Sequence, residues 1–210
     1  MKERARTQEG GEAQKGFTLV ELLVSLGIFT VITTIAVVNN SQFNSSILLT
    51  NLAYEVGLSV RQAQFYGIAV KRDSTSGFDA GYGIHFDLTD PRSYYLFEDR
   101  GTKDHICDVT ECAASNLVEG FKLVKGNYIS KICVDGSLGL ACTSAGGFQK
   151  VDISFVRPNP DAYITKDSLS GNYAKAEICI ASPAGTKRRV IVESTGQISV
   201  STDPGLNCAN

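Results

Sequence analysis

The feature that most constrains this chain is an unbroken apolar run near its N-terminus, from Phe17 to Val38. Glu21 is the only charged residue in the run. As a helix at about 1.5 Å per residue, the run would extend roughly 33 Å, close to the ~30 Å hydrocarbon core of a bilayer. The mean hydropathy of the whole chain, −0.02, is that of an ordinary soluble protein and conceals this segment. The run predicts a membrane-spanning helix joined to a polar remainder.

The basic residues around the run predict its orientation. The first basic residue after it is Arg61, whereas four precede it: Lys2, Arg4, Arg6 and Lys15. Because excess Lys and Arg stay on the cytoplasmic side of a span, we expect a single-pass protein whose C-terminal part lies outside the cytoplasm. The alternative is a secretory signal peptide, which usually has an apolar region of about 7–15 residues followed by a small-residue cleavage site. This run is longer, and no convincing Ala-x-Ala site follows it.

The junction before the run resembles a known processing signal. Residues 16–24, GFTLVELLV, are similar to the type III signal of type IV prepilins and type II secretion pseudopilins. The resemblance implies that a membrane prepilin peptidase cuts after Gly16 and methylates the new amino group of Phe17. It also implies partners, namely other pilins or pseudopilins in a helical filament and an assembly platform in the inner membrane. The expected localisation is the cytoplasmic (inner) membrane, then a cell-surface or periplasmic filament.

Glu21 is the expected assembly residue. A carboxylate in an apolar helix costs about 2.5–3.5 kcal/mol at the centre of a bilayer, less near its ends, and usually marks a function. In the first turn of the mature helix the macrodipole favours its negative charge. Given the resemblance, Glu21 of one subunit can neutralise the Phe17 amine of a neighbour and set the axial register of packed helices. The alternative is a tolerated carboxylate that reaches the membrane surface.

A second helical segment is expected after the span. Residues 41–66 contain no proline, and an apolar stripe recurs at four-residue intervals at Leu48, Leu52, Val56 and Val60. Gly67 is a suitable stop, because glycine readily adopts the left-handed conformation of a C-cap. The predicted divisions are a leader peptide (1–16), a transmembrane or filament-core half-helix (17–38), an amphipathic outer half-helix (39–66) and a globular β-rich head (67–210).

From residue 68 onward the hydrophobic period changes to two, which predicts short strands separated by turns. The expected strands are 81–88, 94–97, 121–124, 128–134, 151–156, 176–181, 190–193 and 197–200. Lys125-Gly126-Asn127 and Ser194-Thr195-Gly196 are typical of hairpin turns. The predicted class is α+β. With the resemblance, it is the type IV pilin fold: a long N-terminal α-helix packed on a mostly antiparallel β-sheet head stabilised by disulfides.

Further segments resemble one branch, the minor pseudopilins of the GspH/FimT type. They are Asn51-Leu52 and 59–63 in the outer helix, then 151–155, 159–161, 177–180, 187–192 and 196–198 in the head. This resemblance implies a low-copy structural subunit of a type IV pilus or type II secretion pseudopilus. Such subunits help to initiate the filament or lie near its tip.

All six cysteines lie in the expected head, where an even number outside the cytoplasm indicates disulfides. Sequence alone does not choose among the possible pairings. We favour two pairs that close short loops and one that fastens the C-terminal tail: Cys107–Cys112, Cys133–Cys142 and Cys179–Cys208.

The sequence predicts no enzyme, no metal and no cofactor. The alternative to disulfides is a metal site of His105, Cys107, Cys112 and Cys133, but its spacing lacks the usual zinc-ligand pattern. His85 is expected to face solvent or a neighbouring polar group, and His105 to be solvated in a loop. No nucleophile elbow, phosphate loop or His-Glu-x-x-His motif is present.

A basic cluster of Lys187, Arg188 and Arg189 is the candidate for contact with DNA phosphates. Some FimT-type pilins bind DNA during uptake, so the alternative function is a DNA-binding or surface-binding minor pilin. The DNA-binding members carry further arginines after the late glycine turn, where this chain has Gly196-Gln197-Ile198-Ser199. In a strand Arg188 points opposite to its two neighbours, and the formal net charge of −2 is unfavourable for DNA. We therefore favour a solvated edge strand protected by its charges.

Overall fold

The computed structural model describes residues 16–69, 80–100, 104–107, 112, 117–136, 139–143, 147–167, 171, 173–203 and 205–209. The chain divides into two compact units, Met1–Gln42 and Phe43–Asn210. Helix α1 (Leu19–Ile68) contributes to both, its residues up to 42 belonging to the first unit and the others to the second. Apart from Gly16, the expected leader peptide lies outside the described residues.

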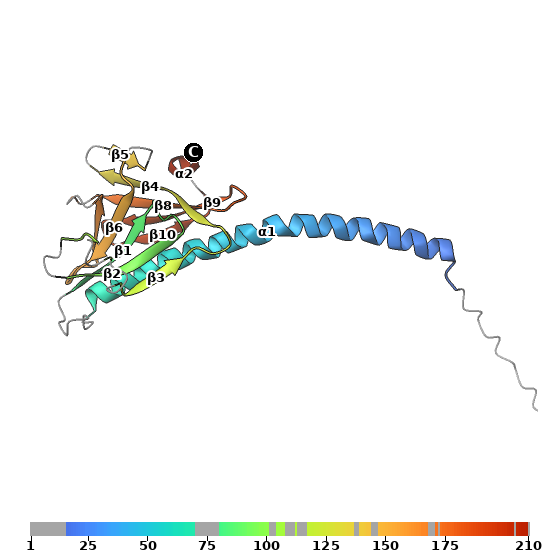
Figure 1. Cartoon of the computed structure of the whole chain (residues 1–210), viewed down its shortest axis with the longest axis horizontal. Coiled ribbons are helices and arrows are strands. Elements are labelled where there is room, and N and C mark those ends of the chain that lie inside the picture. The colour runs from blue at the N-terminus through green and yellow to red at the C-terminus, as the bar shows by residue number, and fades with distance from the viewer. Residues whose placement is uncertain are drawn as a thin grey trace, which may run out of the picture. The chain divides into compact units, whose positions relative to one another are not determined.

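The second unit comprises the expected head and the adjoining part of α1, and it is called the head from this point. Its described residues contain two five-stranded sheets (Figure 1). The first sheet consists, in order, of β3 (Glu119–Lys122), β2 (Ser93–Asp99), β1 (Gly81–Asp87), β6 (Lys150–Phe155) and β7 (Ala162–Lys166). The second consists of β10 (Ile198–Ser201), β9 (Lys187–Glu193), β8 (Lys175–Ala181), β4 (Tyr128–Gly136) and β5 (Gly139–Cys142). A short helix, α2 (Gly205–Ala209), follows β10. Every strand pairing among the described residues is antiparallel, so the predicted α+β class is confirmed.

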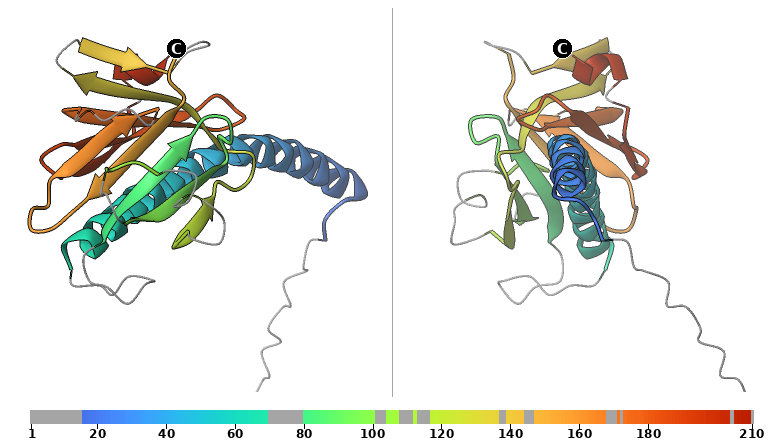
Figure 2. Two further views of the ribbon diagram at one scale, coloured as in Figure 1. Left: turned by 60° about the vertical axis from the view of Figure 1, so that its left-hand side comes forward. Right: turned by 90° about the vertical axis from the view of Figure 1, so that its right-hand side faces the viewer.

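The head portion of α1 packs against the inner faces of both sheets (Figure 2). The helix buries Leu49, Leu52, Ala53, Val56, Val60 and Ala63. They share one apolar core with Ile84 and Ile153 of the first sheet and with Ile178 and Val190 of the second. The predicted helical stripe is therefore confirmed, with Leu48 only partly buried at its start.

The prediction that Gly67 ends the helix is wrong. α1 continues to Ile68, and the backbone N–H of Ala69 still donates to the carbonyl oxygen of Phe65 at 2.8 Å. A Cβ at position 67 would lie only 2.3 Å from the carbonyl oxygen of Phe155 at the end of β6. The glycine is explained by this close approach of the last helical turn to the first sheet.

The eight predicted strand regions all contain strands, but β5, β7 and α2 were not predicted. β5 and β7 each lie at one edge of a sheet and have a single neighbour, β4 for β5 and β6 for β7. Short edge strands carry a weak hydrophobic pattern, because only one side of the backbone is paired and little apolar surface is enclosed.

One of the two predicted hairpins is correct. Ser194-Thr195-Gly196 connects the antiparallel neighbours β9 and β10, and the N–H of Gly196 donates to the carbonyl oxygen of Glu193 at 2.8 Å. Lys125-Gly126-Asn127 forms a turn but no hairpin, because it joins β3 in the first sheet to β4 in the second. The crossing is held by the preceding β1–β2 turn, whose Pro91 carbonyl oxygen accepts from the N–H of Ile129 at 2.7 Å.

Candidate functional site: the start of helix α1

A helix cap formed by Thr18 and Glu21 leads the chain into α1. The Oγ1 of Thr18 accepts a hydrogen bond from the backbone N–H of Glu21 at 3.2 Å. The carbonyl oxygen of Thr18 accepts from the N–H of Leu22 at 3.1 Å. Thr18 is thus the N-cap and Glu21 the third helical residue, which is the spacing of a capping box. Glu21 also places its carboxylate where the helix macrodipole stabilises a negative charge.

Gly16 and Phe17, the residues of the expected cleavage site, lie before the helix. A Cβ built at Gly16 meets no atom within 4 Å, and Phe17 is 81% exposed. Packing within the described part of the chain therefore does not require a glycine at position 16. The peptide bond between the two residues is accessible in the described structure.

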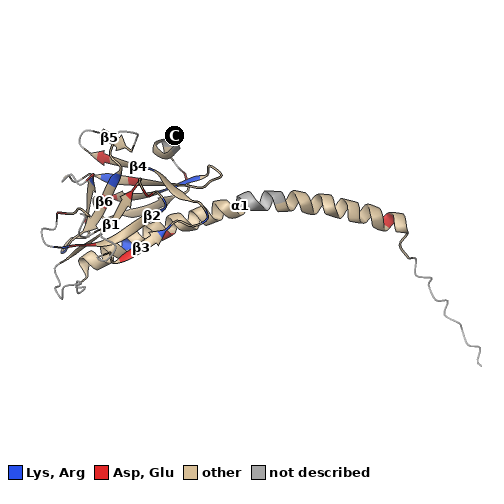
Figure 3. Cartoon of the chain, viewed as in Figure 1, with Lys and Arg blue, Asp and Glu red and all other residues tan. Residues whose placement is uncertain are grey.

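The following helical segment, Leu19–Val37, is long and apolar enough to cross a membrane. Its mean hydropathy is 2.2, none of it is buried by the described residues, and Glu21 is its only charged residue (Figure 3). The hydroxyls of the segment donate to backbone carbonyls about one turn earlier, as Ser25 does to Glu21 and Thr34 to Thr30, each at 2.7 Å. Thr30 and Thr33 do the same. These hydroxyls are satisfied without water, which is what a hydrocarbon environment requires.

Comparison with known proteins identifies this segment. The family model described as the prokaryotic N-terminal methylation motif matches residues 13–37. The matched range contains Gly16, Phe17, Glu21 and the apolar segment. The motif indicates a type IV pilin-like protein that is processed as a prepilin and assembles with other pilins, which is a structural class of protein. No curated protein and no solved structure matches the chain.

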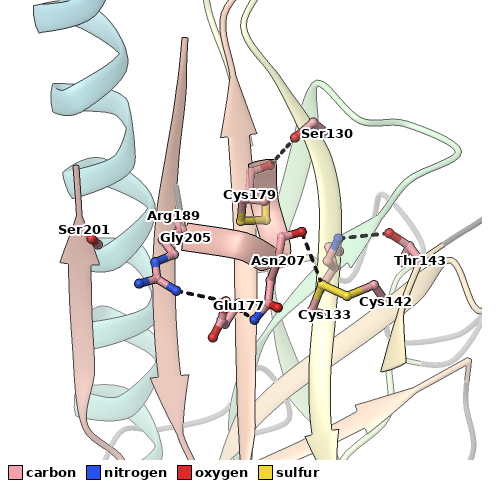
Figure 4. Close-up of a disulfide and its surroundings, with 12 residues drawn as sticks. Ser130, Cys133, Cys142, Thr143, Glu177, Cys179, Arg189, Ser201, Gly205 and Asn207 are labelled. Atoms are coloured by element: carbon pink, nitrogen blue, oxygen red, sulfur yellow. Dashed lines mark hydrogen bonds and ion pairs between the residues drawn. A yellow bond between two sulfur atoms is a disulfide. The ribbon is translucent and has the colours of Figure 1, made fainter. Parts of the chain in front are cut away.

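In the head, the cysteines form the three disulfides that the sequence favours: Cys107–Cys112, Cys133–Cys142 and Cys179–Cys208. Cys133 and Cys142 are register partners in the β4–β5 pair. Cys208 joins α2 to β8, so the C-terminal tail is fastened to the second sheet (Figure 4). The alternative metal site needs Cys133 beside His105, Cys107 and Cys112, but Cys133 is bonded to Cys142 instead.

Glu177 on β8 organises the charges around this tail (Figure 4). Its buried carboxylate lies 2.9 Å from Lys175 Nζ and 3.2 Å from an Arg189 guanidinium nitrogen, and it accepts a hydrogen bond from Asn207 Nδ2 at 3.0 Å. Burial by itself raises the pKa of the Glu177 carboxyl. The hydrogen bonds from Lys175 and Asn207 and the charges of Lys175 and Arg189 outweigh burial and hold this pKa below its ordinary value.

The two histidines lie on the face of the first sheet that points away from the α1 core. His85 faces a polar group, the second of the two expected alternatives: its Nδ1 lies 2.5 Å from Asp152 Oδ1 and both side chains are buried. The expectation that His105 is solvated is wrong. Its ring stacks on Tyr163 with 3.9 Å between centroids, and its Nδ1 lies 3.0 Å from Ser154 Oγ. Burial lowers the pKa of His105 and favours the neutral ring.

The basic cluster is not on an edge strand, so that expectation is also wrong. β9 lies between β10 and β8. The prediction that Arg188 points opposite to its neighbours is correct, because it reaches α1 and donates to Thr50 Oγ1 and Ser46 Oγ. Arg189 faces the other side and pairs with Glu177. Arg188 and Arg189 therefore both have partners within the chain.

The sequence analysis did not predict the Thr18 cap, the His85–Asp152 pair or the hydrogen bond from Arg188 to Thr50. The capping role of Thr18 had a local signal, the Ser/Thr-x-x-Glu spacing with Glu21. The pairing of His85 with Asp152, and that of Arg188 with Thr50, had none. These partners are far apart in the sequence, and only strand register and helix packing bring them together.

Proposed function

We propose that this chain is a minor pilin or pseudopilin of the GspH/FimT type. It is a structural subunit that prepilin peptidase cleaves between Gly16 and Phe17 and methylates at Phe17. The mature chain spans the inner membrane once, with its head outside the cytoplasm. The assembly platform then builds it into a type IV pilus or type II secretion pseudopilus, at initiation or at the tip.

One observation carries this proposal: the matched methylation motif contains an apolar helix with a single carboxylate, and none of that helix is buried by the described part of the chain. Lipid can cover such a helix before assembly, and the helices of neighbouring subunits can cover it in a filament. Both environments tolerate the segment because its hydroxyls are satisfied internally. The exposed Gly16–Phe17 bond supports access of a peptidase to the site.

Glu21 is proposed to determine how subunits pack in the filament. The Thr18 cap uses the backbone N–H of Glu21, and no described hydrogen bond involves its carboxylate. A free amine at Phe17 and this carboxylate are both costly in an apolar bundle unless they are paired. Pairing between subunits therefore favours an axial register in which each Glu21 meets the amine of a neighbour.

The head half of α1 offers a further surface for neighbouring subunits, opposite its buried face. Four of its exposed apolar residues are Ile47, Tyr54, Leu58 and Phe65. Because they are spaced by seven, four and seven residues, they lie in one row along the helix. Leu58 and Phe65 are each 66% exposed. We infer that this row packs on other subunits of the filament.

The assignment to the minor, GspH/FimT-type branch rests on the resemblance of the strand segments. The segments 177–180, 187–192 and 196–198 belong to β8, β9 and the turn into β10, which are neighbours in the second sheet. The three segments that resemble this branch therefore lie side by side in one sheet. A low copy number is the property of this branch that is easiest to measure.

Mass spectrometry of sheared filaments from cells that express the full chain tests the proposal. We expect a subunit that starts at methylated Phe17, at low abundance relative to the main filament subunit. Gly16→Ala should leave the chain uncut in the membrane fraction, whereas the matched control Gly27→Ala should be processed normally. A wild-type chain that keeps residues 1–16 and stays in the membrane would refute the proposal, and a high filament abundance would refute its minor role.

The DNA-binding alternative receives little support from the head. Arg188 and Arg189 are held by α1 and by Glu177, so neither guanidinium is arranged for phosphate contact. A gel shift at low and high salt decides the question, because phosphate binding weakens steeply with salt. We expect no shift at low salt; a salt-dependent shift would restore the alternative.

A further inference from the structure

A histidine, an aspartate and a disulfide lie together on the outer face of the first sheet, away from α1. Asp152 and His85 are register partners on β6 and β1 and are both buried. Residues 104–107 lie over this face. The carbonyl oxygen of His105 accepts from Thr165 Oγ1 at 3.3 Å, and the backbone N–H of Cys107 donates to the Asp152 carboxylate. The Cys107–Cys112 disulfide is thereby held next to the His85–Asp152 pair.

The distances within this group are short. One ring nitrogen of His85 and the Sγ atoms of Cys107 and Cys112 all lie within 4.8 Å of one another. Nδ1 of His85 is committed to Asp152, so Nε2 is the nitrogen that remains for a ligand bond. A histidine whose other nitrogen donates to a carboxylate is the usual arrangement of a metal-binding imidazole, because the carboxylate fixes the ring and its tautomer.

We propose that His85, Cys107 and Cys112 form a redox-gated site for a thiophilic divalent cation of the Zn²⁺ type. In the disulfide form, the two sulfur atoms are bonded to each other and the site is closed. In the dithiol form, the two thiolates and His85 Nε2 bind the cation, and a solvent molecule completes a tetrahedral set. Asp152 is a positioning residue that orients His85.

The chemistry balances with a thiol or phosphine reductant. The reductant supplies two electrons and is itself oxidised, two thiols to a disulfide or a phosphine and water to the phosphine oxide. The Cys107–Cys112 bond breaks, and the two protons that this oxidation releases complete the thiols. The cation then forms two metal–sulfur bonds, and both thiol protons return to solvent. Metal–sulfur bonds of about 2.3 Å and a metal–nitrogen bond of about 2.0–2.1 Å separate the ligand atoms by roughly 3.5–3.8 Å in a tetrahedral site. The observed group needs only local movement to reach this geometry.

Opening this disulfide is also the least disruptive of the three. It closes the shortest loop, with a sequence separation of 5, against 9 and 29 for the others. In the chain-entropy description, the stabilisation from a disulfide grows with loop length. Reduction of Cys107 and Cys112 should therefore lower the stability of the head less than reduction of either other disulfide.

Co²⁺ titration of the full chain in detergent micelles tests the site. The oxidised chain should show no thiolate-to-cobalt absorption, and the chain reduced with a phosphine under anaerobic conditions should show it. Zn²⁺ should then displace the Co²⁺. His85→Ala should abolish the tetrahedral signal, and Asp152→Asn should weaken binding by about 10–100-fold. His105→Ala is the matched control and should bind as the wild type does.

A second measurement, which needs no variant, distinguishes Cys107 and Cys112 from the other four cysteines. In the reduced wild-type chain, bound Zn²⁺ should slow the alkylation of Cys107 and Cys112 and leave the alkylation rates of the other four cysteines unchanged. The proposal is overturned by a reduced chain that binds no Co²⁺, by unchanged binding in His85→Ala, or by protection of other cysteines instead. Co²⁺ binding to the oxidised chain at the same affinity would also overturn it.

Discussion

Arg188 on β9 donates a hydrogen bond from Nε to Thr50 Oγ1 on α1 at 3.0 Å. The same guanidinium donates to Ser46 Oγ at 2.9 Å and to the carbonyl oxygen of Thr202 at 3.3 Å. Arg188, from the basic cluster of residues 187–189, thus links the helix to the second sheet. Arg188, which the sequence offers as a DNA contact, therefore has its partners within the fold.

Arg188→Ala should reduce the free energy of unfolding of the head by about 1.5–3 kcal/mol, because it removes charge-assisted hydrogen bonds and leaves two hydroxyls of α1 without their donor. Urea unfolding of the full chain in detergent micelles, followed by near-ultraviolet circular dichroism, measures the change. Arg188→Lys is the matched control and should recover part of it. A loss below about 0.5 kcal/mol for Arg188→Ala would contradict a structural role.

Substitutions at Thr18 and Glu21 separate helix capping from charge pairing. Glu21→Gln keeps the capping-box residue type and removes the charge, whereas Thr18→Ala removes the cap and keeps the charge. We expect Glu21→Gln and Glu21→Ala to reduce filament incorporation strongly while membrane insertion stays normal. Thr18→Ala should cost about 0.5–2 kcal/mol of helix stability and retain most incorporation.

Immunoblots of the sheared-filament fraction and of the membrane fraction measure filament incorporation and membrane insertion. If Thr18→Ala abolishes incorporation and Glu21→Gln does not, capping rather than charge is the function of this pair of residues.

Gly67→Ala should destabilise the head, although alanine is the better helix former. The new Cβ would lie 2.3 Å from the Phe155 carbonyl oxygen, so helix or sheet must shift, at a cost of about 1–3 kcal/mol. Gly27→Ala is the control, because a Cβ there meets nothing within 4 Å. That control should be neutral or stabilising by up to about 1 kcal/mol, as helix propensity predicts. Equal effects of the two substitutions in urea unfolding would show that the close approach to Phe155 does not constrain the helix.

Glu177 predicts a loss of stability in acid. The pKa of its carboxyl is lower in the folded head than its ordinary value of 4.5, since its partners outweigh the effect of burial. A lowered folded pKa gives stability that is fully present above the ordinary pKa and is lost as the pH falls through the folded pKa. The urea concentration at the unfolding midpoint should therefore decrease when the pH is lowered below about 4.5. Glu177→Gln should be less stable at neutral pH and show a smaller acid-induced drop; an unchanged drop would assign it to other carboxyl groups.

Most of the fold could be predicted from local patterns. The buried face of α1 follows from the recurrence of Leu52, Val56 and Val60, and the larger strands follow from alternation. The helix end at Ile68 could not be predicted, because the close contact between Gly67 and Phe155 depends on how the helix packs. The Lys125–Asn127 turn has hairpin residues, yet the strands that it joins enter different sheets. Turn chemistry acts over a few residues, whereas strand pairing is decided by burial across the whole head.

The sequence by itself determined the N-terminal segment. The order of Gly16, Phe17 and Glu21 before an uncharged run, and the hydropathy of that run, are local properties that need no partner elsewhere in the chain. Only the tertiary structure decided what the polar residues of the head do. Arg188 serves α1, and His85 meets Asp152 beside the Cys107–Cys112 disulfide. The physical reason is that a buried polar group must find its partner in space, and the packing of sheets and helix brings together residues that are far apart in sequence.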